Sequence, residues 1–380
     1  MKGCAAGVDD PKRSVEARQR VGVLAHERLQ ALSMGKHVHM TLMSPREPSV
    51  SVIVPSYNRR DRLARLLGEL EHHHDRGAAF EVVVAVDGST DGTIEMLSTL
   101  RTGFALRVIA KPRGGPASAR NAAIAAAAGD VLLFLDDDVA PQEGLFDRHV
   151  TFHSTHARAA AVGRMAAPPG TLLPAWLEWE AALLDRQYGR MQSGLHPIDW
   201  RVFYTANASV RREDVLAVGG FDERFVREED VELAHRLAAR GVSFHFLPEA
   251  IVHHDPDRTF EVWLAVAFER GRKNLLLESQ LAPADRSLAA EWRRRHLLNR
   301  VLARWSLGHE ERTRLVVAAL RRALVAPSPR ARRFVCSALF NVKYWAGVAE
   351  ASGPGTAMWR DLAATASPRG QVEVGPQRTR

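Results

Sequence analysis

Apolar and polar residues follow one another in two kinds of block along the middle of the chain. Short continuous apolar runs are typical of strands that are buried on both faces of a sheet. Such runs cover residues 50–54, 81–86, 106–109 and 131–135. Between them, apolar residues recur every three or four positions, which predicts helices over residues 60–70, 91–100 and 117–128. This alternation predicts an α/β domain with a mixed, mostly parallel sheet.

The pattern continues toward the C-terminus and then changes. A helix that opens at residues 228–230 and a strand over residues 243–247 complete the α/β part. Further helices are predicted over residues 260–277, 288–305, 310–324 and 330–349. The start of the chain is polar, basic and weakly patterned. We therefore expect a mobile tail at residues 1–48, an α/β domain at 49–258, a basic helical extension at 259–350 and a disordered tail at 351–380.

Composition narrows the class of protein. The 380 residues are 46% hydrophobic and 25% charged, as in ordinary globular proteins. Two cysteines exclude a disulfide scaffold and a cysteine metal cluster. No apolar stretch approaches the ~18 residues that a membrane-spanning helix needs. The basic N-terminus is not followed by an apolar run, so we expect a cytoplasmic protein without a secretory signal.

The charge of the chain points to anionic partners. With 52 Lys and Arg against 44 Asp and Glu, the formal net charge is +8, which suits nucleotides, phosphates, acidic lipids or nucleic acid. Arginines are dense on the C-terminal helices, interleaved with apolar residues. Two interpretations stay open there: an appendage with a solvated basic face, or peripheral contact with the inner face of a membrane. No nucleic-acid module accompanies the charge, so nucleic acid is not an expected partner.

Polar clusters follow three of the predicted strands, at residues 55–59, 87–89 and 136–138. Because ligands lie at the carboxyl ends of the strands in such sheets, these clusters predict one binding site. Along an extended segment, Asp136 and Asp138 point the same way and Asp137 points the other way. Adjacent carboxylates repel one another, and bound Mg²⁺ or Mn²⁺ would relieve that repulsion. The alternative is a solvated acidic turn.

Three further groups are candidates for chemistry. Glu228-Glu229-Asp230 opens a helix with more negative charge than the helix N-terminus needs. His253-His254 follows a strand and is either a metal ligand or a surface pair. Gly114-Gly115-Pro116 precedes a helix and could bring backbone N–H groups to a phosphate. Neither a P-loop nor a G-x-G-x-x-G motif occurs, which argues against kinases, ATPases and dinucleotide oxidoreductases.

Seven motifs together make this sequence similar to glycosyltransferase family 2. They stand in the family's order, at residues 50–59, 87–93, 114–121, 134–138, 219–222, 229–230 and 248–254. The resemblance covers residues 49–258. It implies a GT-A fold, which is a nucleotide-sugar-binding α/β domain. It also implies inverting transfer of a sugar from a nucleoside-diphosphate sugar.

The resemblance further implies roles for individual residues. Asp138 would hold the metal ion and complete an Asp-x-Asp motif with Asp136, and Asp230 would be the general base. His254 matches the family histidine after the last strand, with His253 as the alternative register. The residues implied at the nucleotide sugar are Pro55, Tyr57, Arg59, Asp87, Arg120, Asp136 and Asp137. Those implied on the acceptor side are Trp176, Asn207 and Glu229.

Two features leave the specificity open. Val86 stands where the family often has the first of two aspartates, so the base of the nucleotide is not identified. Trp176 and Trp179 lie three residues apart, on one face of a helix. They are either a platform for the acceptor sugar or part of a packed core.

Two other functions compete with the glycosyltransferase interpretation. A sugar-nucleotidyltransferase would need a Gly-rich loop after the first strand, where this chain has Pro55-Ser56-Tyr57-Asn58-Arg59. A catalytically silent scaffold would be expected to lose the metal aspartates or the base, but Asp136, Asp138 and Asp230 are all present. The expected partners are a nucleoside-diphosphate sugar and a saccharide or lipid-linked acceptor, with Mg²⁺ or Mn²⁺ as cofactor.

Overall fold

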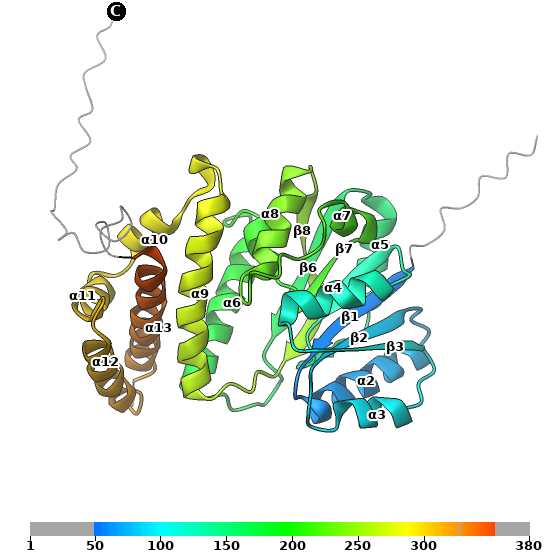
Figure 1. Ribbon diagram of the computed structural model, residues 1–380, viewed down its shortest axis with the longest axis horizontal. Coiled ribbons are helices and arrows are strands. Elements are labelled where there is room, and N and C mark those ends of the chain that lie inside the picture. The colour runs from blue at the N-terminus through cyan, green and yellow to red at the C-terminus, as the bar shows by residue number, and fades with distance from the viewer. Residues whose placement is uncertain (1–48, 327, 354–380) are drawn as a thin grey trace, which may run out of the picture. The chain divides into compact units, whose positions relative to one another are not determined.

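The computed structural model describes residues 49–326 and 328–353, and these form an eight-stranded sheet with helices around it (Figure 1). The strands are β1 (Val50–Ser56), β2 (Glu81–Asp87), β3 (Ala105–Lys111), β4 (Val131–Leu135), β5 (Val139–Pro141), β6 (Ala159–Ala166), β7 (Asn207–Arg211) and β8 (Ser243–His254). Their order in the sheet is β3-β2-β1-β4-β7-β6-β8-β5. Pairing is parallel from β3 to β4 and between β6 and β8, and antiparallel elsewhere. The predicted mixed, mostly parallel sheet is confirmed.

Helices pack on both faces of this sheet. One face carries α2 (Arg60–Asp75), α3 (Thr93–Thr99) and α5 (Leu145–Thr155). The other carries α4 (Pro116–Ala126), α7 (Arg212–Ala217) and α8 (Glu229–Ala239). Between β6 and β7 the chain forms α6 (Ala175–Gln192) and a 3₁₀ turn (Trp200–Val202).

The two helical layers explain the continuous apolar runs of the sequence. In β1, Val52 and Val54 lie in the cluster formed with α2, while Ile53 lies in the cluster on the opposite face. All three are fully buried, because successive side chains of a strand point to opposite faces and both faces are covered. Burying each such side chain stabilises the fold by about 1.5–3 kcal/mol.

The second half of the sheet differs from the prediction. Strands β5, β6 and β7 and helices α5 and α7 were not predicted. Strand β8 continues to His254, whereas the pattern predicted an end at Leu247, before Pro248. The register with β6 jumps at this point, where Gly163 pairs with Leu247 and Arg164 with Ile251. A proline is tolerated in a strand at such an irregularity, so the pairing resumes beyond it.

The predicted C-terminal helices are present, with one additional break. They are α9 (Phe260–Gln280), α10 (Leu288–Arg294), α11 (Leu297–Ser306), α12 (Glu310–Ala323) and α13 (Pro329–Ser352), with a 3₁₀ turn at Pro283–Asp285. The single helix predicted over residues 288–305 is divided because Arg295 and His296 are extended. The His296 side chain accepts a hydrogen bond from the backbone N–H of Leu298 and caps the start of α11.

Helices α9 and α13 lie side by side (Figure 1) and approach closely at two glycines. A Cβ atom at Gly271 of α9 would lie 2.0 Å from the carbonyl oxygen of Tyr344. A Cβ atom at Gly347 of α13 would lie 2.0 Å from the carbonyl oxygen of Phe268. The two glycines are therefore needed because the backbones of the two helices touch there.

Some sequence predictions lie outside the described residues. The tail expected at residues 1–48 does so entirely, and the tail expected at 351–380 does so beyond Gly353. The division between domains at residues 258 and 259 stays a prediction. In the described part of the chain, no helix has the length and apolar character needed to cross a membrane.

Candidate active site

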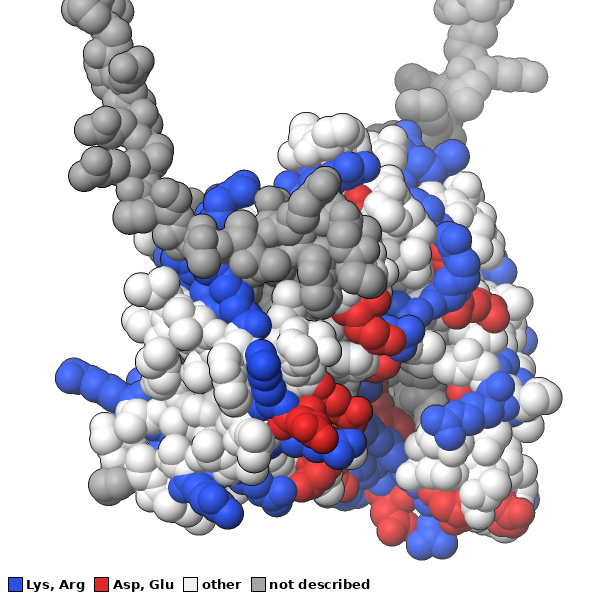
Figure 2. Space-filling model, turned by 60° about the vertical axis from the view of Figure 1, so that its left-hand side comes forward, with Lys and Arg blue, Asp and Glu red and all other residues white. Residues whose placement is uncertain are grey.

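The parallel strands bring three polar segments to one edge of the sheet. β2, β1 and β4 are neighbours, so their carboxyl ends at Asp87, Ser56 and Leu135 lie at the same edge. Asp136, which begins the triple-aspartate motif, follows β4 directly, and Lys111 ends the next strand, β3. On the face that Figure 2 shows, acidic side chains gather beside a hollow.

The pairing of β5 with β8 brings a histidine to the triple aspartate. Val139 pairs with His254, and the His254 Nε2 lies 3.5 Å from the Asp138 Oδ1. His253 points to the opposite face of the strand, where its Nε2 lies 2.7 Å from the Gln142 side-chain nitrogen. The geometry thus pairs His254, rather than His253, with Asp138.

Asp138 has the properties of a metal ligand. Its Oδ2 accepts a hydrogen bond of 2.7 Å from Arg59, while its buried Oδ1 has no hydrogen-bond partner. Burial alone would raise the pKa of Asp138, but His254 and Arg59 hold that pKa well below its usual value. The carboxylate therefore stays ionised, with one oxygen and an imidazole nitrogen available.

This donor pair fits a divalent cation that is also bound by substrate. Among the described residues, no group of three or more His, Cys, Asp or Glu side chains could hold a metal ion by itself. Mg²⁺ is commonly held by one or two carboxylates plus substrate phosphates, and imidazole nitrogen suits Mn²⁺ as well. Asp138 and His254 therefore fit a metal ion whose remaining ligands come from a bound diphosphate or water.

Asp137 and Arg59 form an ion pair inside the fold. The buried Asp137 carboxylate accepts hydrogen bonds from the Ser56 hydroxyl at 2.8 Å and from Arg59 at 2.9 Å. Burial raises the pKa of Asp137 to about 6, although Arg59 opposes that rise. The oxygens of Asp137 join the end of β1 to the turn after β4, and its contact with the nucleotide sugar stays a prediction. The Arg59 guanidinium donates hydrogen bonds to both Asp137 and Asp138.

Asp87 organises the Gly-rich turn before α4. Its Oδ1 accepts hydrogen bonds of 2.8 Å from the Lys111 Nζ and from the backbone N–H of Gly114. Its Oδ2 accepts one of 2.8 Å from the N–H of Gly115, whose φ of 90° favours glycine. Burial would raise the pKa of Asp87, but these donors lower it. Lys111 was not predicted as a site residue, although its position at the end of a strand could have indicated one.

Pro55 and Tyr57 lie half-buried at the end of β1. The Arg113 guanidinium lies over the Tyr57 ring, 3.9 Å from its centroid, and donates a hydrogen bond to the phenol oxygen. The Gly-rich turn thereby contacts the loop after β1. The role of Pro55 and Tyr57 as the wall of a nucleoside pocket stays a prediction.

Arg120 links the triple aspartate to the start of α8. This arginine is 4% exposed and projects from α4. Its two terminal nitrogens lie 2.8 Å from Asp136 and 2.8 Å from the buried Glu229. The link matters because a buried charge that loses a partner costs several kcal/mol, so the three side chains hold one another in place.

Asp230 follows Glu229 and has the properties of a base. It is half-buried, and its carboxylate accepts hydrogen bonds from the N–H groups of Val231 at 2.9 Å and Thr205 at 3.4 Å. Burial, followed by the charges of Glu229 and Glu228, raises the pKa of Asp230 to about 7. A carboxylate with that pKa can take a proton from a hydroxyl group near neutral pH.

The residue before this pair has an unusual backbone conformation. Glu228 has a φ of 61°, which is uncommon for a residue other than glycine and costs about 1–2 kcal/mol. The Arg270 Nε of α9 lies 2.5 Å from the Glu228 carboxylate. Three residues further along α9, the Lys273 Nζ donates a hydrogen bond of 2.8 Å to the carbonyl oxygen of Arg224. Helix α9 thus holds the loop that leads to Asp230, and the sequence offered no signal for these contacts.

Asn207, expected on the acceptor side, lies inside the fold. It is 1% exposed, and its amide nitrogen donates to the carbonyl oxygen of Ala250 at 2.9 Å. Its Oδ1 lies 3.2 Å from the Nε2 of buried His149, which in turn bonds the Ser209 hydroxyl at 2.7 Å. His153 shares the same hydroxyl at 2.8 Å. Asn207 therefore belongs to a buried polar cluster between α5 and the sheet.

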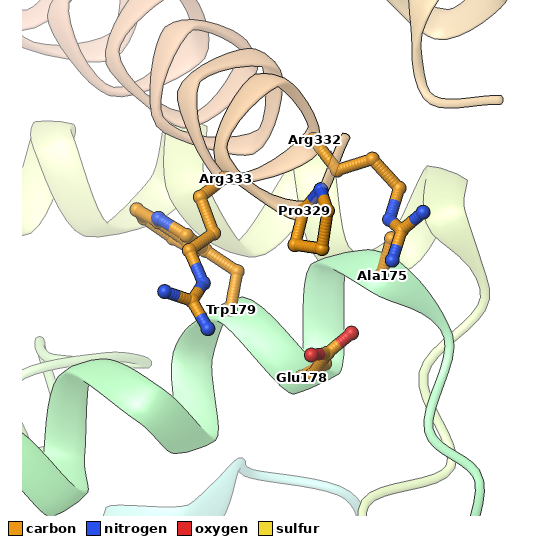
Figure 3. A pocket seen from close by; sticks show the side chains of 6 residues that line it. All are labelled: Ala175, Glu178, Trp179, Pro329, Arg332 and Arg333. Carbon is orange, nitrogen blue, oxygen red and sulfur yellow. The ribbon is translucent and has the colours of Figure 1, made fainter. Parts of the chain in front are cut away.

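Trp176 and Trp179 belong to the packing between α6 and the C-terminal helices. The Trp176 ring meets Phe260 edge to face, and its Nε1 donates to the carbonyl oxygen of Arg258 at 3.1 Å. Trp179 packs in the same way against Trp263. Figure 3 shows Trp179 in a small pocket where α6 meets α13. The structure therefore favours core packing, rather than an acceptor platform, as the role of these tryptophans.

This chain is similar to known glycosyltransferases. The family described as "Glycosyl transferase family 2" matches residues 51–218. An uncharacterized glycosyltransferase, YfnE of Bacillus subtilis, is 29% identical over 254 residues, which cover 54% of this chain and 64% of the relative. A pre-mycofactocin glycosyltransferase of Mycobacterium tuberculosis is 30% identical over 234 residues, which cover 59% and 48%. The chain thus spans 64% of the length of the first relative and 48% of the length of the second.

A solved structure shows the same fold. It is the mannosyltransferase PcManGT from Pyrobaculum calidifontis in complex with GDP-Man and Mn²⁺, with a TM-score of 0.53 and 19% identity. The match covers 86% of this chain and 95% of that one. The α/β fold is therefore of the GT-A type, followed by C-terminal helices. Residues 51–218 of this chain thus match glycosyl transferase family 2, and the chain is similar to glycosyltransferases over that segment.

Proposed function

We propose that this chain is an inverting glycosyltransferase that moves a sugar from a nucleoside-diphosphate sugar to an acceptor hydroxyl. Asp230 is the general base, and Asp138 with His254 holds Mg²⁺ or Mn²⁺. The observation that carries the proposal is the Arg120 bridge, which joins Asp136 to Glu229 at 2.8 Å on each side. Because of that bridge, the aspartates after β4 and the base at the start of α8 belong to one site.

The proposed reaction is a single displacement at the anomeric carbon. The Asp230 carboxylate takes the proton of the acceptor hydroxyl as its oxygen bonds to the anomeric carbon. The bond from that carbon to the diphosphate breaks, and its electron pair leaves with the nucleoside diphosphate. Attack opposite the leaving group inverts the anomeric configuration. A divalent cation at Asp138 and His254 would neutralise the charge of the leaving diphosphate.

Other parts of the site suit the donor. Pro55 and Tyr57 offer a half-exposed wall for the nucleoside, and Asp87 fixes the Gly-rich turn beside the strand ends by accepting the N–H groups of Gly114 and Gly115. The Pyrobaculum enzyme of the same fold was solved with GDP-Man and Mn²⁺, which supports this class of donor and a metal ion. The acceptor in this proposal is a saccharide or lipid-linked hydroxyl of a cell-envelope precursor.

Nucleotide-dependent stabilisation tests the proposed function. Thermal unfolding of the full chain is measured with UDP, GDP, CDP and dTDP, each with and without Mn²⁺. A nucleotide at ~100 times its Kd should add about 2.7 kcal/mol to the free energy of unfolding. We expect one nucleotide to stabilise the chain strongly only when Mn²⁺ is present. Asp138 and His254 alone offer the metal ion too few ligands, so the metal ion and the diphosphate should bind together.

Two variants make this test specific. Asp138→Asn should abolish the Mn²⁺-dependent shift while keeping the hydrogen bond to Arg59. Asp147→Ala, at an exposed position of α5, should leave the shift unchanged. If no nucleotide stabilises the chain at millimolar concentration, or if Asp138→Asn responds like the unmodified chain, the nucleotide-sugar proposal is wrong.

Arg270 should act on turnover through the loop that carries the base. Arg270→Gln removes the partner that holds Glu228 in its left-handed conformation, so Asp230, two residues later, should shift. A displacement of about 1 Å at a reacting group can cost about 10²-fold in rate. We expect kcat to fall by about that factor, with the nucleotide affinity unchanged.

The acid limb of the pH–rate profile distinguishes this role from general destabilisation. Without the Arg270 cation, the negative charge of Glu228 beside Asp230 is no longer compensated. The pKa of Asp230 should rise, so the acid limb should move to higher pH. Arg272→Gln is the matched control, because Arg272 of the same helix pairs with Glu269 and Glu350 instead. Glu228→Gly in the Arg270→Gln background should recover part of the rate, since glycine adopts this conformation without strain. Equal losses in both arginine variants would contradict the positioning role.

A further inference from the structure

Helix α11 presents its apolar side chains to solvent. Leu297 is 58% exposed, Leu298 45%, Val301 49% and Trp305 49%. These positions recur at the spacing of one helix face. Such a face on a helix of a globular protein normally packs against the core, so an outward apolar stripe indicates something that covers it.

The inner face of α11 packs on its neighbours through buried Asn299, Ala303 and Ser306. Buried Asn299 donates a hydrogen bond of 3.1 Å to the Ser337 hydroxyl of α13. Buried Thr313 of α12 donates one of 3.1 Å to the carbonyl oxygen of Ser306. These polar contacts join α11 to its neighbours in the chain. The apolar stripe is therefore not required for the packing of the C-terminal helices.

The stripe lies in a strongly basic part of the chain. Residues 288–325 hold nine arginines against three glutamates. The Arg312 guanidinium of α12 lies 5.6 Å from the Trp305 ring centroid, so cationic and apolar groups are interleaved at the stripe itself. Arg300 and Arg304 stand one turn apart on α11. Next to α11, α12 exposes a further large apolar side chain, Leu315, at 63%.

The view in Figure 2 brings the C-terminal helices forward. It shows a largely uncharged surface with Lys and Arg side chains around most of its margin and Asp and Glu side chains gathered on one side. An exposed apolar helix face bordered by arginines matches the two layers of a membrane surface, which are acyl chains beneath anionic phosphates. A nucleic acid would match the arginines but would leave the apolar stripe in contact with water.

We propose that the α11–α12 face, formed by Leu297, Leu298, Val301, Trp305 and Leu315 with the arginines around them, binds the surface of an anionic membrane. The apolar side chains enter the boundary between headgroups and acyl chains, and Trp305 lies at headgroup depth, as amphipathic aromatic rings prefer. The arginines contact lipid phosphates. This surface does not depend on the glycosyl transfer proposed above, but it would bring the site to lipid-linked acceptors.

Vesicle binding by the full chain tests the proposal. Sedimentation is compared for phosphatidylcholine vesicles with and without phosphatidylglycerol. The chain should bind the anionic vesicles, and added salt should weaken that binding. The double variant Val301→Glu/Trp305→Glu should lose affinity by about tenfold or more, since charged groups replace the inserting side chains. The matched control is Leu195→Glu/Leu216→Glu, which changes two exposed leucines elsewhere and should bind like the unmodified chain.

The other outcomes overturn the proposal. Equal binding by both double variants would place the membrane contact elsewhere in the chain. Absence of binding to anionic vesicles would reject the membrane as occupant. A concentration-dependent dimer that Val301→Glu/Trp305→Glu abolishes would assign the face to a second copy of the chain. Circular dichroism checks that the exposed substitutions leave the helices folded.

Discussion

Replacing Asp230 by asparagine should lower kcat by roughly 10²–10⁴-fold while the nucleotide still stabilises the chain. The amide keeps the size of the carboxylate and can still accept the N–H of Val231 through its oxygen. It cannot take the proton of the acceptor hydroxyl, so the loss should lie in the chemical step. Single-turnover kinetics with saturating donor would measure it. Unchanged turnover would reject Asp230 as the base.

The pH dependence of the unmodified enzyme gives an independent check on Asp230. Burial and the neighbouring Glu229 and Glu228 raise the pKa of Asp230 to about 7. The base works in its deprotonated form, so kcat should fall as pH drops through 7 and level off above it. Glu143→Gln, which changes an exposed carboxylate paired with Arg76, should leave this limb in place. An acid limb whose midpoint lies in the ordinary pKa range of carboxylates would contradict the raised pKa of Asp230.

Acidification below pH 6.5 should destabilise the fold through two buried histidines. Burial lowers the pKa of His149 to about 4 and that of His153 to about 3. Between those values and the unfolded pKa, the unfolded chain binds protons that the folded chain does not. The free energy of unfolding should therefore decrease as the pH is lowered, by at most about 1.4 kcal/mol per pH unit for each histidine. Urea unfolding at several pH values measures the slope.

Variants separate these histidines from other titrating groups. His153→Gln should remove the contribution of one histidine from the slope, and exposed His72→Gln should leave the slope unchanged. Asp137 acts with the opposite sign, because its pKa is raised in the folded state and protonation below about pH 6 favours folding. The comparison between variants cancels that contribution. Equal slopes for His153→Gln and the unmodified chain would contradict the prediction.

The tertiary structure changed the interpretation of several site residues for one physical reason. Sequence spacing says which side chains follow a strand but not whether solvent reaches them. Asp137 and Asp138 are adjacent, yet Asp137 has its oxygens bonded inside the fold, whereas Asp138 keeps a buried oxygen free beside His254. Asn207 and Trp176 were expected near an acceptor, but both complete buried or packed contacts with distant segments.

Local patterns along the chain indicated the similarity to glycosyl transferase family 2 and predicted the parallel half of the sheet. Continuous apolar runs such as residues 131–135 predict strands buried on both faces, because only a sheet covered by helices on both sides hides every side chain. Motif order also identified Asp138 and Asp230 as candidates for metal binding and proton transfer, and those roles stay predictions. Both kinds of inference rest on patterns that are local in the chain.

The distant groups that complete the site could be identified from the three-dimensional contacts alone. Contacts between residues far apart leave no local pattern, so Arg270, 42 positions after Glu228, could not be associated with it from spacing. The same holds for the close approach of α13 to Gly271, where an added Cβ atom would lie 2.0 Å from the Tyr344 carbonyl oxygen. It also holds for α11, whose apolar face the pattern would place inside. Packing between distant segments determines which side chains are buried, and burial determines which charges and apolar groups remain available for function.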